Sequence, residues 1–186
     1  MNCSTGRLPS RPPAGRPGPL TDGMSNGWVI LLHELLVDQL ERLTVAAERE
    51  TATGATSRRA GRAGPNTKLL AHLLDLIYVK VPTDPASPAY EQGSTLGPAH
   101  RHWRRAKTGN GRYRLFFRYR ADARVIIFAW VNDQATLRAR GKATDAYYVF
   151  RGMLGRGHPP SDWDALLSEV RKARDHDSTR HDPPAR

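Results

Sequence analysis

Residues 102–133 read HWRRAKTGNGRYRLFFRYRADARVIIFAWVND, and they decide the fold of this chain of 186 residues. Side chains on a β-strand alternate between the two faces of a sheet, and residues 112–120 alternate in chemical character at that period. One face carries Arg112, Arg114, Phe116, Arg118 and Arg120. The other face carries Tyr113, Leu115, Phe117 and Tyr119. We therefore predict a strand that is basic on one face and hydrophobic on the other.

A hairpin turn precedes this strand. The residues Gly109–Gly111 tolerate positive φ, so the chain before them should fold back as an antiparallel strand. If the turn has two residues, Lys107 lies opposite Arg114 and Arg105 lies opposite Phe116, which adds both cations to the basic face. A turn longer by one residue would break this grouping. The register of the hairpin is therefore the structural prediction on which the candidate site depends.

Two more strands are indicated by short apolar runs. The run Val125–Val131 is rich in β-branched residues, as in an interior strand, and completes a three-stranded antiparallel meander. The run Trp28–Leu32 follows Asn26 and Gly27 and suits a first strand that enters the sheet.

Helical periodicity predicts two helices before the meander and two after it. The first spans Glu34–Glu50, and the second begins with Asn66 as its N-cap and ends by Val81, before Pro82. Both should bury their apolar stripes against the face of Tyr113, Leu115, Phe117 and Tyr119. The two later helices are expected at Asp145–Leu154 and from Ser161, where Ser161 and Asp164 resemble a capping box.

The sequence indicates one domain with polar ends. Met24, followed by Ser-Asn-Gly-Trp, is a candidate start of the chain. We expect a disordered leader rich in Pro, Arg and Gly at 1–24, the folded domain at 25–174 with a flexible connector at 51–65, and a disordered tail at 175–186.

The composition favours a polyanionic partner and a cytoplasmic location. The net charge is +11, and Cys3 is the only cysteine, which excludes a disulfide framework and a cysteine-based metal site. His100 and His102 are a weak metal signal because no acid or cysteine completes a site. No metal or cofactor is expected. No apolar run approaches the ~18 residues of a membrane span, and the N-terminus lacks the apolar segment of a secretory signal.

Several sequence blocks resemble the YhaV-type toxins of the RelE superfamily, and they occur in order between about Asn26 and Val170. The run GRYRLFFRY (111–119) together with RGHPP (156–160) is the most specific part. The other blocks are NGW (26–28), WVND (130–133), TLR (136–138), GKATDAY (141–147) and SDW (161–163).

This resemblance implies a fold, an activity and partners. The fold would be α+β and RelE-like, of the microbial ribonuclease type, with a twisted antiparallel sheet flanked by two N-terminal helices and by C-terminal helices. The activity would be that of a type II toxin, an mRNA interferase that cleaves mRNA, often on translating ribosomes. A co-expressed antitoxin of the PrlF type, with an AbrB-like fold, would neutralise it.

Metal-free RNA cleavage proceeds by attack of the ribose 2′-hydroxyl on the neighbouring phosphate. It needs a base, positive charge on the phosphorane and an acid for the departing oxygen. Guanidinium groups bind phosphate oxygens through two parallel hydrogen bonds, so Arg105, Arg114 and Arg118 are candidates for the positive charge. Lys107 is a candidate proton acceptor, because its cationic neighbours disfavour its charged form.

Two candidates come from the C-terminal part of the chain. The resemblance implies a tyrosine in a C-terminal helix, and Tyr147 is our candidate. Tyr148 is its alternative, because helical neighbours point ~100° apart and only one can face the sheet. The RGHPP block adds His158, whose imidazole can act as acid or base at neutral pH, although the two prolines that follow could mean that it only fixes a loop. Further RNA contacts are expected from Trp103, Arg104, Arg112, Arg120, Arg138 and Lys142.

The residues alone leave alternatives open. An arginine-rich strand face often binds phosphate without catalysis, so a non-catalytic module that binds RNA or ribosomes is the second hypothesis. Its affinity would fall linearly with the logarithm of salt concentration, and no cleavage product would appear. Trp103 and Trp130 suit packing better than base stacking.

Overall fold

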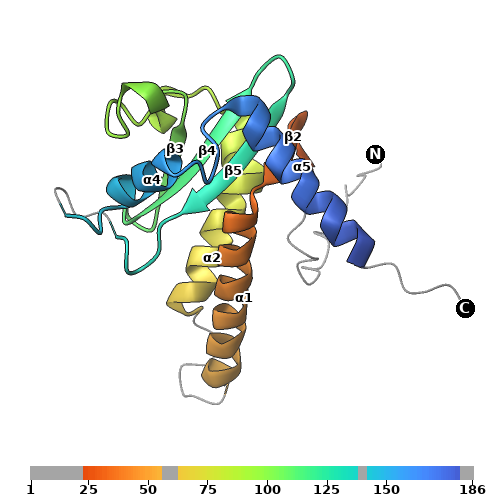
Figure 1. Cartoon of the computed structure of the whole chain (residues 1–186). Coiled ribbons are helices and arrows are strands. Elements are labelled where there is room, and N and C mark those ends of the chain that lie inside the picture. Colours follow the sequence, from red (N-terminus) through yellow and green to blue (C-terminus); the bar gives the residue numbers. More distant parts are fainter. Residues whose placement is uncertain (1–22, 56–62, 138–141, 181–186) are drawn as a thin grey trace, which may run out of the picture.

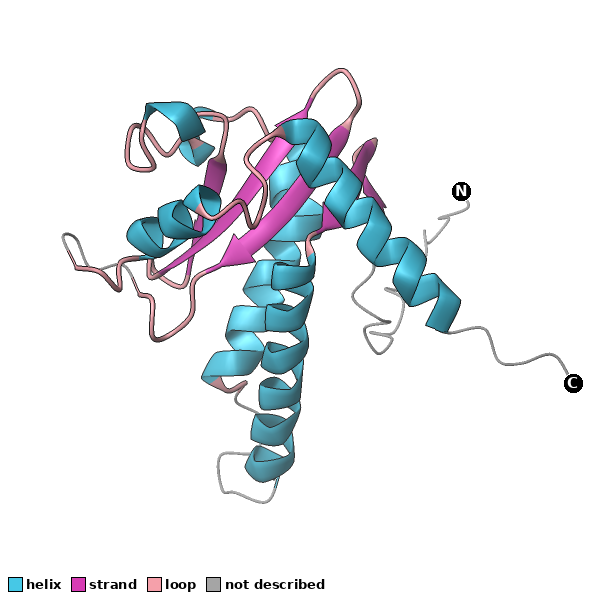
Figure 2. Cartoon of the chain, in the orientation of Figure 1, coloured by secondary structure: helices cyan, strands magenta, loops and turns pink. Residues whose placement is uncertain are grey.

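A five-stranded sheet forms the centre of the protein, with helices on both faces (Figures 1 and 2). The structure is a computed structural model that describes residues 23–55, 63–137 and 142–180. The strand order is β1-β2-β5-β4-β3. The strands are β1 (Gly23–Ser25), β2 (Trp28–Leu32), β3 (Arg104–Thr108), β4 (Tyr113–Arg120) and β5 (Val125–Val131).

The sheet is mixed, which corrects one part of the expected fold. The meander β3-β4-β5 is antiparallel as predicted, but β2 pairs with β5 in parallel. A parallel pair needs a long crossover, and here the connection carries several helices and the β3–β4 hairpin. The α+β class is confirmed, whereas a wholly antiparallel sheet is wrong.

The helices α1 (Glu34–Ala55) and α2 (Pro65–Asp75) lie side by side and cover one face of the sheet (Figure 1). Their apolar stripes meet Leu115 and Phe117 of β4, both fully buried, in one hydrophobic cluster. Tyr113 belongs to the same cluster, and Tyr119 packs against it. The predicted hydrophobic face of β4 is confirmed.

The opposite face of β4 is also covered. Helix α4 (Ala146–Gly155) and helix α5 (Trp163–Arg180) pack there, and the fully buried Phe116 stacks on Phe150 and on Trp130, which also stack on each other. The face predicted to be basic is therefore interrupted by a hydrophobic cluster. Phe116 divides the arginines of this face, so Arg114 and Arg118 occupy different surroundings.

The second helix begins differently from the prediction. Gly64 is the N-cap and Pro65 is the first helical residue, so Asn66 is not the cap. Pro65 needs no partner for a backbone N–H, which suits this position. The Glu50 carboxylate of α1 accepts hydrogen bonds from the backbone N–H groups of Asn66 and Thr67 at 3.0–3.1 Å. A side chain from the neighbouring helix thus performs the capping.

The second helix also continues past its predicted end. A π-helical turn (Leu76–Lys80) leads into the short helix α3 (Val81–Thr83), which contains Pro82. Proline has no backbone N–H to donate to the carbonyl four residues earlier. That carbonyl belongs to Tyr78, and it accepts a hydrogen bond of 2.6 Å from the Ser25 hydroxyl of β1. Strand β1 therefore compensates for the proline.

The ends of the described chain are more ordered than predicted. Gly23 and Met24 pair with β2, although both fall in the expected leader. Helix α1 runs to Ala55 instead of ending at Glu50, and α5 runs to Arg180 instead of ending near residue 174. The expectations for residues 1–22, 56–62 and 181–186 lie outside the described residues. Within the part of the chain that the structure describes, no helix is long and apolar enough to cross a membrane.

Candidate active site

The β3–β4 hairpin has the register that the sequence predicts. Lys107 lies opposite Arg114, and Arg105 lies opposite Phe116. Thr108 and Tyr113 form the last pair, so the turn comprises residues 109–112 and has four residues instead of two. Gly109, Asn110 and Gly111 all have positive φ, at 57°, 55° and 75°. Because the turn is longer by two residues, the same side chains still point to the same face of the sheet. Arg105, Lys107 and Arg114 therefore remain on one face, as predicted.

Arg105, Lys107, Arg114 and Tyr147 form what we call the arginine–tyrosine cluster. The Nε of Arg105 donates a hydrogen bond of 2.8 Å to the Tyr147 hydroxyl. The guanidinium of Arg114 lies over the ring of Tyr147, 5.8 Å from its centroid. Arg105 is half-buried and Lys107 is exposed, whereas Arg114 and Tyr147 are 8% and 6% exposed. A phosphate can therefore reach Arg105 and Lys107 most directly.

Helix α4 brings Tyr147 to the cluster. The side chain of Asp145 is the N-cap and accepts a hydrogen bond from the Tyr147 backbone N–H at 3.0 Å. The Tyr147 ring meets Phe116 edge-on at 5.6 Å, while Tyr148 points outward and is 55% exposed. Between the two tyrosines that the sequence left open, Tyr147 is the one that faces the sheet.

The backbone of Arg114 is held by Asn132, a residue that our sequence reasoning did not select. The Asn132 side-chain oxygen accepts from the Arg114 N–H at 2.5 Å, and its amide donates to the Arg112 carbonyl at 3.2 Å. The Nη1 of Arg114 donates to the Gly111 carbonyl. Its buried Nε has no hydrogen-bond partner within the described residues. The sequence feature that could have indicated Asn132 is its position directly after the apolar strand Val125–Val131.

Arg118 does not join the cluster. Its Nη1 donates to the Ser161 carbonyl at 2.6 Å, and its guanidinium lies over the rings of Trp103 and Trp163. The Ser161 hydroxyl in turn lies 2.9 Å from Nδ1 of His100 and 3.1 Å from Nε2 of His102. Arg118 thus anchors the loop before α5. The structure therefore does not bring Arg118 together with Arg105 and Arg114, whereas the sequence predicts one group.

The histidine pair near Ser161 is a hydrogen-bonded contact between two loops. Burial, together with the nearby charge of Arg118, lowers the pKa of His102 to about 4. Burial also lowers the pKa of His100. Both rings therefore favour the neutral form at neutral pH, which suits their contact with a hydroxyl.

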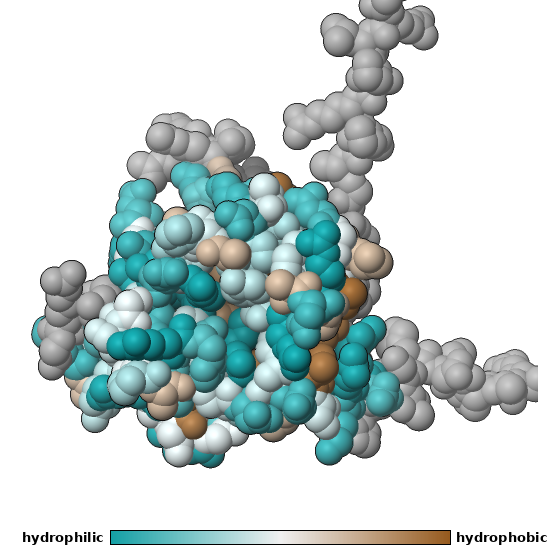
Figure 3. All heavy atoms as spheres, turned by 90° about the horizontal axis from the view of Figure 1, so that it is seen from above, coloured by the Kyte–Doolittle hydropathy of each residue, from teal (hydrophilic) through white to brown (hydrophobic). Residues whose placement is uncertain are grey.

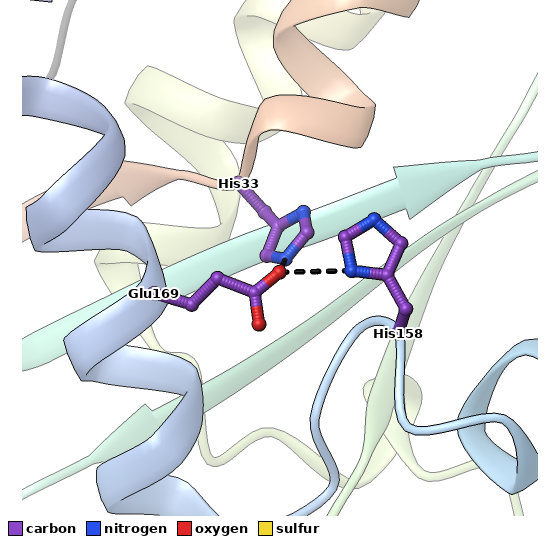
Figure 4. A group of neighbouring side chains, drawn as sticks. All are labelled: His33, His158 and Glu169. Carbon is purple, nitrogen blue, oxygen red and sulfur yellow. Dashed lines mark hydrogen bonds and ion pairs between the residues drawn. The ribbon is translucent and has the colours of Figure 1, made fainter. Parts of the chain in front are cut away.

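His158 lies in a different cluster, with His33 and Glu169 (Figure 4). One carboxylate oxygen of Glu169 lies 2.9 Å from Nδ1 of His158 and 3.1 Å from Nε2 of His33. Nε2 of His158 lies 3.4 Å from Glu34. His33 follows β2, and β2 is three strand positions from β3, or about 14 Å. The structure therefore does not bring His158 to Arg105, which corrects its expected place at the site.

The His33–His158–Glu169 group has the composition of a metal site, since its ligand atoms lie within 4.8 Å of one another. The hydrogen bonds of His33 argue for another role. Its Nδ1 accepts the backbone N–H of Leu35 at 3.2 Å, so the neutral ring carries its proton on Nε2. That nitrogen faces Glu169 and has no lone pair for a metal. Burial lowers the pKa of His33, which keeps the ring neutral, although Glu169 opposes this effect.

The remaining candidates for RNA contact separate into several groups. Trp103 is fully buried and meets Phe150 edge-on at 5.0 Å, which agrees with the packing role that was the alternative to RNA contact. Arg104 points to the face of the sheet opposite Arg105. Its Nη1 forms an ion pair of 3.1 Å with Glu91, but the geometry is not that of a hydrogen bond. Arg120 pairs with Asp122 at 3.1 Å. Arg138 lies outside the described residues.

Arg112 and Lys142 are exposed and remain candidates for RNA contact. The face of the molecule seen from above carries mostly hydrophilic side chains, with small separate hydrophobic areas (Figure 3). Such a surface suits a polar ligand better than an apolar one.

Fold and site together define a class: a small α+β protein with a guanidinium-rich site suited to phosphate groups. Residues 30–171 match the model of a family described as a toxin with endonuclease activity, of a toxin–antitoxin system. The chain therefore belongs to the YhaV toxin family. It is a toxin with endonuclease activity, and its system implies an antitoxin partner.

Similar proteins are known from Escherichia coli. The Ribonuclease toxin YhaV of strain K12 is 44% identical over 146 residues, which cover 78% of this chain and 93% of that protein. Toxin YhaV of strain O6:H1 is 43% identical over 149 residues, which cover 80% of this chain and 95% of the relative. No solved structure matches this chain.

Proposed function

We propose that the chain is a metal-independent endoribonuclease whose site is the arginine–tyrosine cluster. The observation that carries this proposal is the contact of Arg105 with Tyr147 at 2.8 Å, beside Arg114 and Lys107. The name of the K12 relative supports RNA as the substrate. Family membership favours this enzyme over the non-catalytic binding module.

The proposed reaction assigns the chemical roles to the two accessible groups of the cluster, Arg105 and Lys107. The 2′-oxygen forms a bond to phosphorus while the bond from phosphorus to the 5′-oxygen breaks, which leaves a 2′,3′-cyclic phosphate and a 5′-hydroxyl. Arg105 binds the phosphate oxygens, whose negative charge grows in the transition state. Lys107, the exposed amine of the cluster, is assigned in its neutral form to accept the proton of the 2′-hydroxyl, and solvent water supplies the proton that the departing 5′-oxygen takes up.

Tyr147 and Arg114 have a positioning role in this proposal. Both are nearly buried; Tyr147 contacts Arg105, and Arg114 lies opposite Lys107 and over the Tyr147 ring. Tyr147 fixes the direction of the Arg105 guanidinium, and Arg114 adds a second positive charge beneath the phosphate. A preorganised guanidinium loses less freedom when it binds phosphate.

The test of this proposal is cleavage of single-stranded RNA in excess EDTA, followed by analysis of the new ends. We expect cleavage to persist and to leave 2′,3′-cyclic or 3′-phosphate ends. A matched RNA whose riboses are 2′-O-methylated should stay intact because it lacks the attacking hydroxyl. Loss of cleavage in EDTA, with recovery on adding a divalent metal, would contradict the proposal.

The partners and the location follow from the proposed substrate. We assign mRNA as the substrate, cleaved in the cytoplasm on the ribosome, and a PrlF-type antitoxin with an AbrB-like fold as the neutralising partner. Expression of the toxin alone should arrest growth and translation, and co-expression of the antitoxin should restore both. Cleavage of free mRNA at the same rate with and without ribosomes would contradict the ribosomal part.

A further inference from the structure

A basic groove lies between α2 and the β3–β4 turn. It has a volume of about 500 Å³. Lys68, His72 and Lys80 line it from the helical side, and Lys107 and Arg112 line it from the hairpin. Among the described residues that line it, none is acidic. The amides of Asn66, Asn110 and Gln134 add polar groups that can contact nucleotide bases.

Most of the positive charge in this groove is not neutralised. Lys80 pairs with Asp75 at 2.6 Å. In contrast, Lys68, Lys107 and Arg112 have no ion pair with any residue that the structure describes, and all three are exposed. Unpaired cations facing one groove favour an anionic ligand, because binding neutralises them and releases counterions.

The groove and the candidate active site share one residue, Lys107 of the edge strand β3. This lysine lies opposite Arg114 in the arginine–tyrosine cluster and also lines the groove. A polynucleotide whose scissile phosphate lies at Arg105 can therefore continue past Lys107 towards Lys68. An acidic protein segment could satisfy the same charges, but the shared lysine connects the groove to the position of the substrate.

We propose that this groove is a second binding site for the substrate and holds the phosphates of single-stranded RNA that flank the cleavage position. This inference rests on the proposed function for its choice of ligand. Lys68 and Arg112 each contact one flanking phosphate, and Lys107 lies at the junction with the cleavage site. The groove thus adds affinity along the strand without touching the reacting atoms.

The test compares Lys68→Gln with Lys172→Gln, a matched change of an exposed lysine on α5. Binding of a labelled, uncleavable 2′-O-methyl RNA is measured by fluorescence anisotropy at several salt concentrations. Lys68→Gln should weaken binding roughly twofold to fivefold. It should also reduce the slope of log affinity against log salt by about 0.7, the value for one single-strand phosphate contact. Lys172→Gln should leave both unchanged.

Cleavage kinetics on natural RNA complete the test. Lys68→Gln should raise KM on a long RNA and leave kcat within about twofold, whereas Lys172→Gln should alter neither. Equal RNA binding by the two variants would overturn the inference, as would a Lys68→Gln protein that loses affinity only for the antitoxin. If RNA binding depends on Lys68 but no RNA is cleaved, the proposed function fails while the groove stands.

Discussion

The Tyr147 hydroxyl accepts a hydrogen bond from Nε of Arg105, and this contact, together with the one from Nη1 to the Ala89 carbonyl at 3.0 Å, orients the half-buried guanidinium of the proposed site. Tyr147→Phe removes the oxygen and keeps the ring that packs against Phe116. We expect kcat for RNA cleavage to fall by roughly 10-fold to 100-fold, because a misplaced guanidinium stabilises the transition state less well. Tyr148→Phe is the matched control, since that side chain is 55% exposed and points outward. Equal activity of the two variants would remove Tyr147 from the site.

His33 gives a pH-dependent contribution to stability. Its side chain is fully buried and its Nδ1 accepts the Leu35 N–H, so protonation of the ring would break this contact. The other titratable groups near the ring are His158, which also disfavours protonation, and the carboxylates of Glu169 and Glu34, which favour it. The unfolded chain takes up a proton at this residue below pH ~6.5, whereas the lowered pKa makes the folded chain resist it. The free energy of unfolding should therefore decrease as the pH falls below ~6.5.

The measurement is urea denaturation at pH 7.5 and pH 5.5 for the parent and for His33→Asn, which does not titrate but can still cap a helix. We expect the loss of stability between these pH values to be smaller in the variant. An identical loss in both proteins would show that His33 does not contribute.

At the scale of residues, the sequence predicts neighbours along a strand better than contacts across the fold. Strand parity placed Lys107 opposite Arg114 correctly, because any turn with an even number of residues gives the same faces. Arg118 shares that parity, yet it turns to Ser161. This contact, like that of His158 with His33, depends on where the loop before α5 lies, and local periodicity carries no information about it.

At the scale of elements, the start of α2 depends on a side chain from α1. Glu50 accepts the first free N–H groups of α2, so Glu50→Ala should reduce the free energy of unfolding by about 1–2 kcal/mol, as for the loss of a helix cap. Chemical denaturation measures this change. Glu48→Ala, an exposed position on the same helix, is the control and should change stability by less than about 0.5 kcal/mol. Equal effects of the two changes would show that the capping is not specific.

Most of the elements could be predicted, but their ends could not. The strands β2 and β5 begin and end where their apolar runs do. The predicted end of the second helix is wrong because a proline usually stops a helix, whereas a π-helical turn and the Ser25 hydroxyl accommodate Pro82 here. Both compensations come from outside the helix sequence.

At the scale of the whole molecule, helices cover both faces of the sheet. The sequence predicted the α1 and α2 side, because a strand face of Tyr, Leu and Phe needs burial. It did not predict that α4 and α5 close the arginine-bearing face over Phe116. The candidate site is consequently limited to the end of the sheet near the β3–β4 turn, where Arg105 and Lys107 remain accessible.

Single-turnover cleavage of RNA by Arg105→Ala and by His158→Ala tests the central claim most directly. The two residues lie in separate clusters, so their effects distinguish the two possible centres of the site. We predict that Arg105→Ala lowers the rate about 100-fold, or about 3 kcal/mol, because one preorganised contact to the transition state is lost. His158→Ala should stay within a few-fold of the parent. Full activity of a folded Arg105→Ala protein, with loss of activity in His158→Ala, would contradict the arginine–tyrosine cluster as the active site.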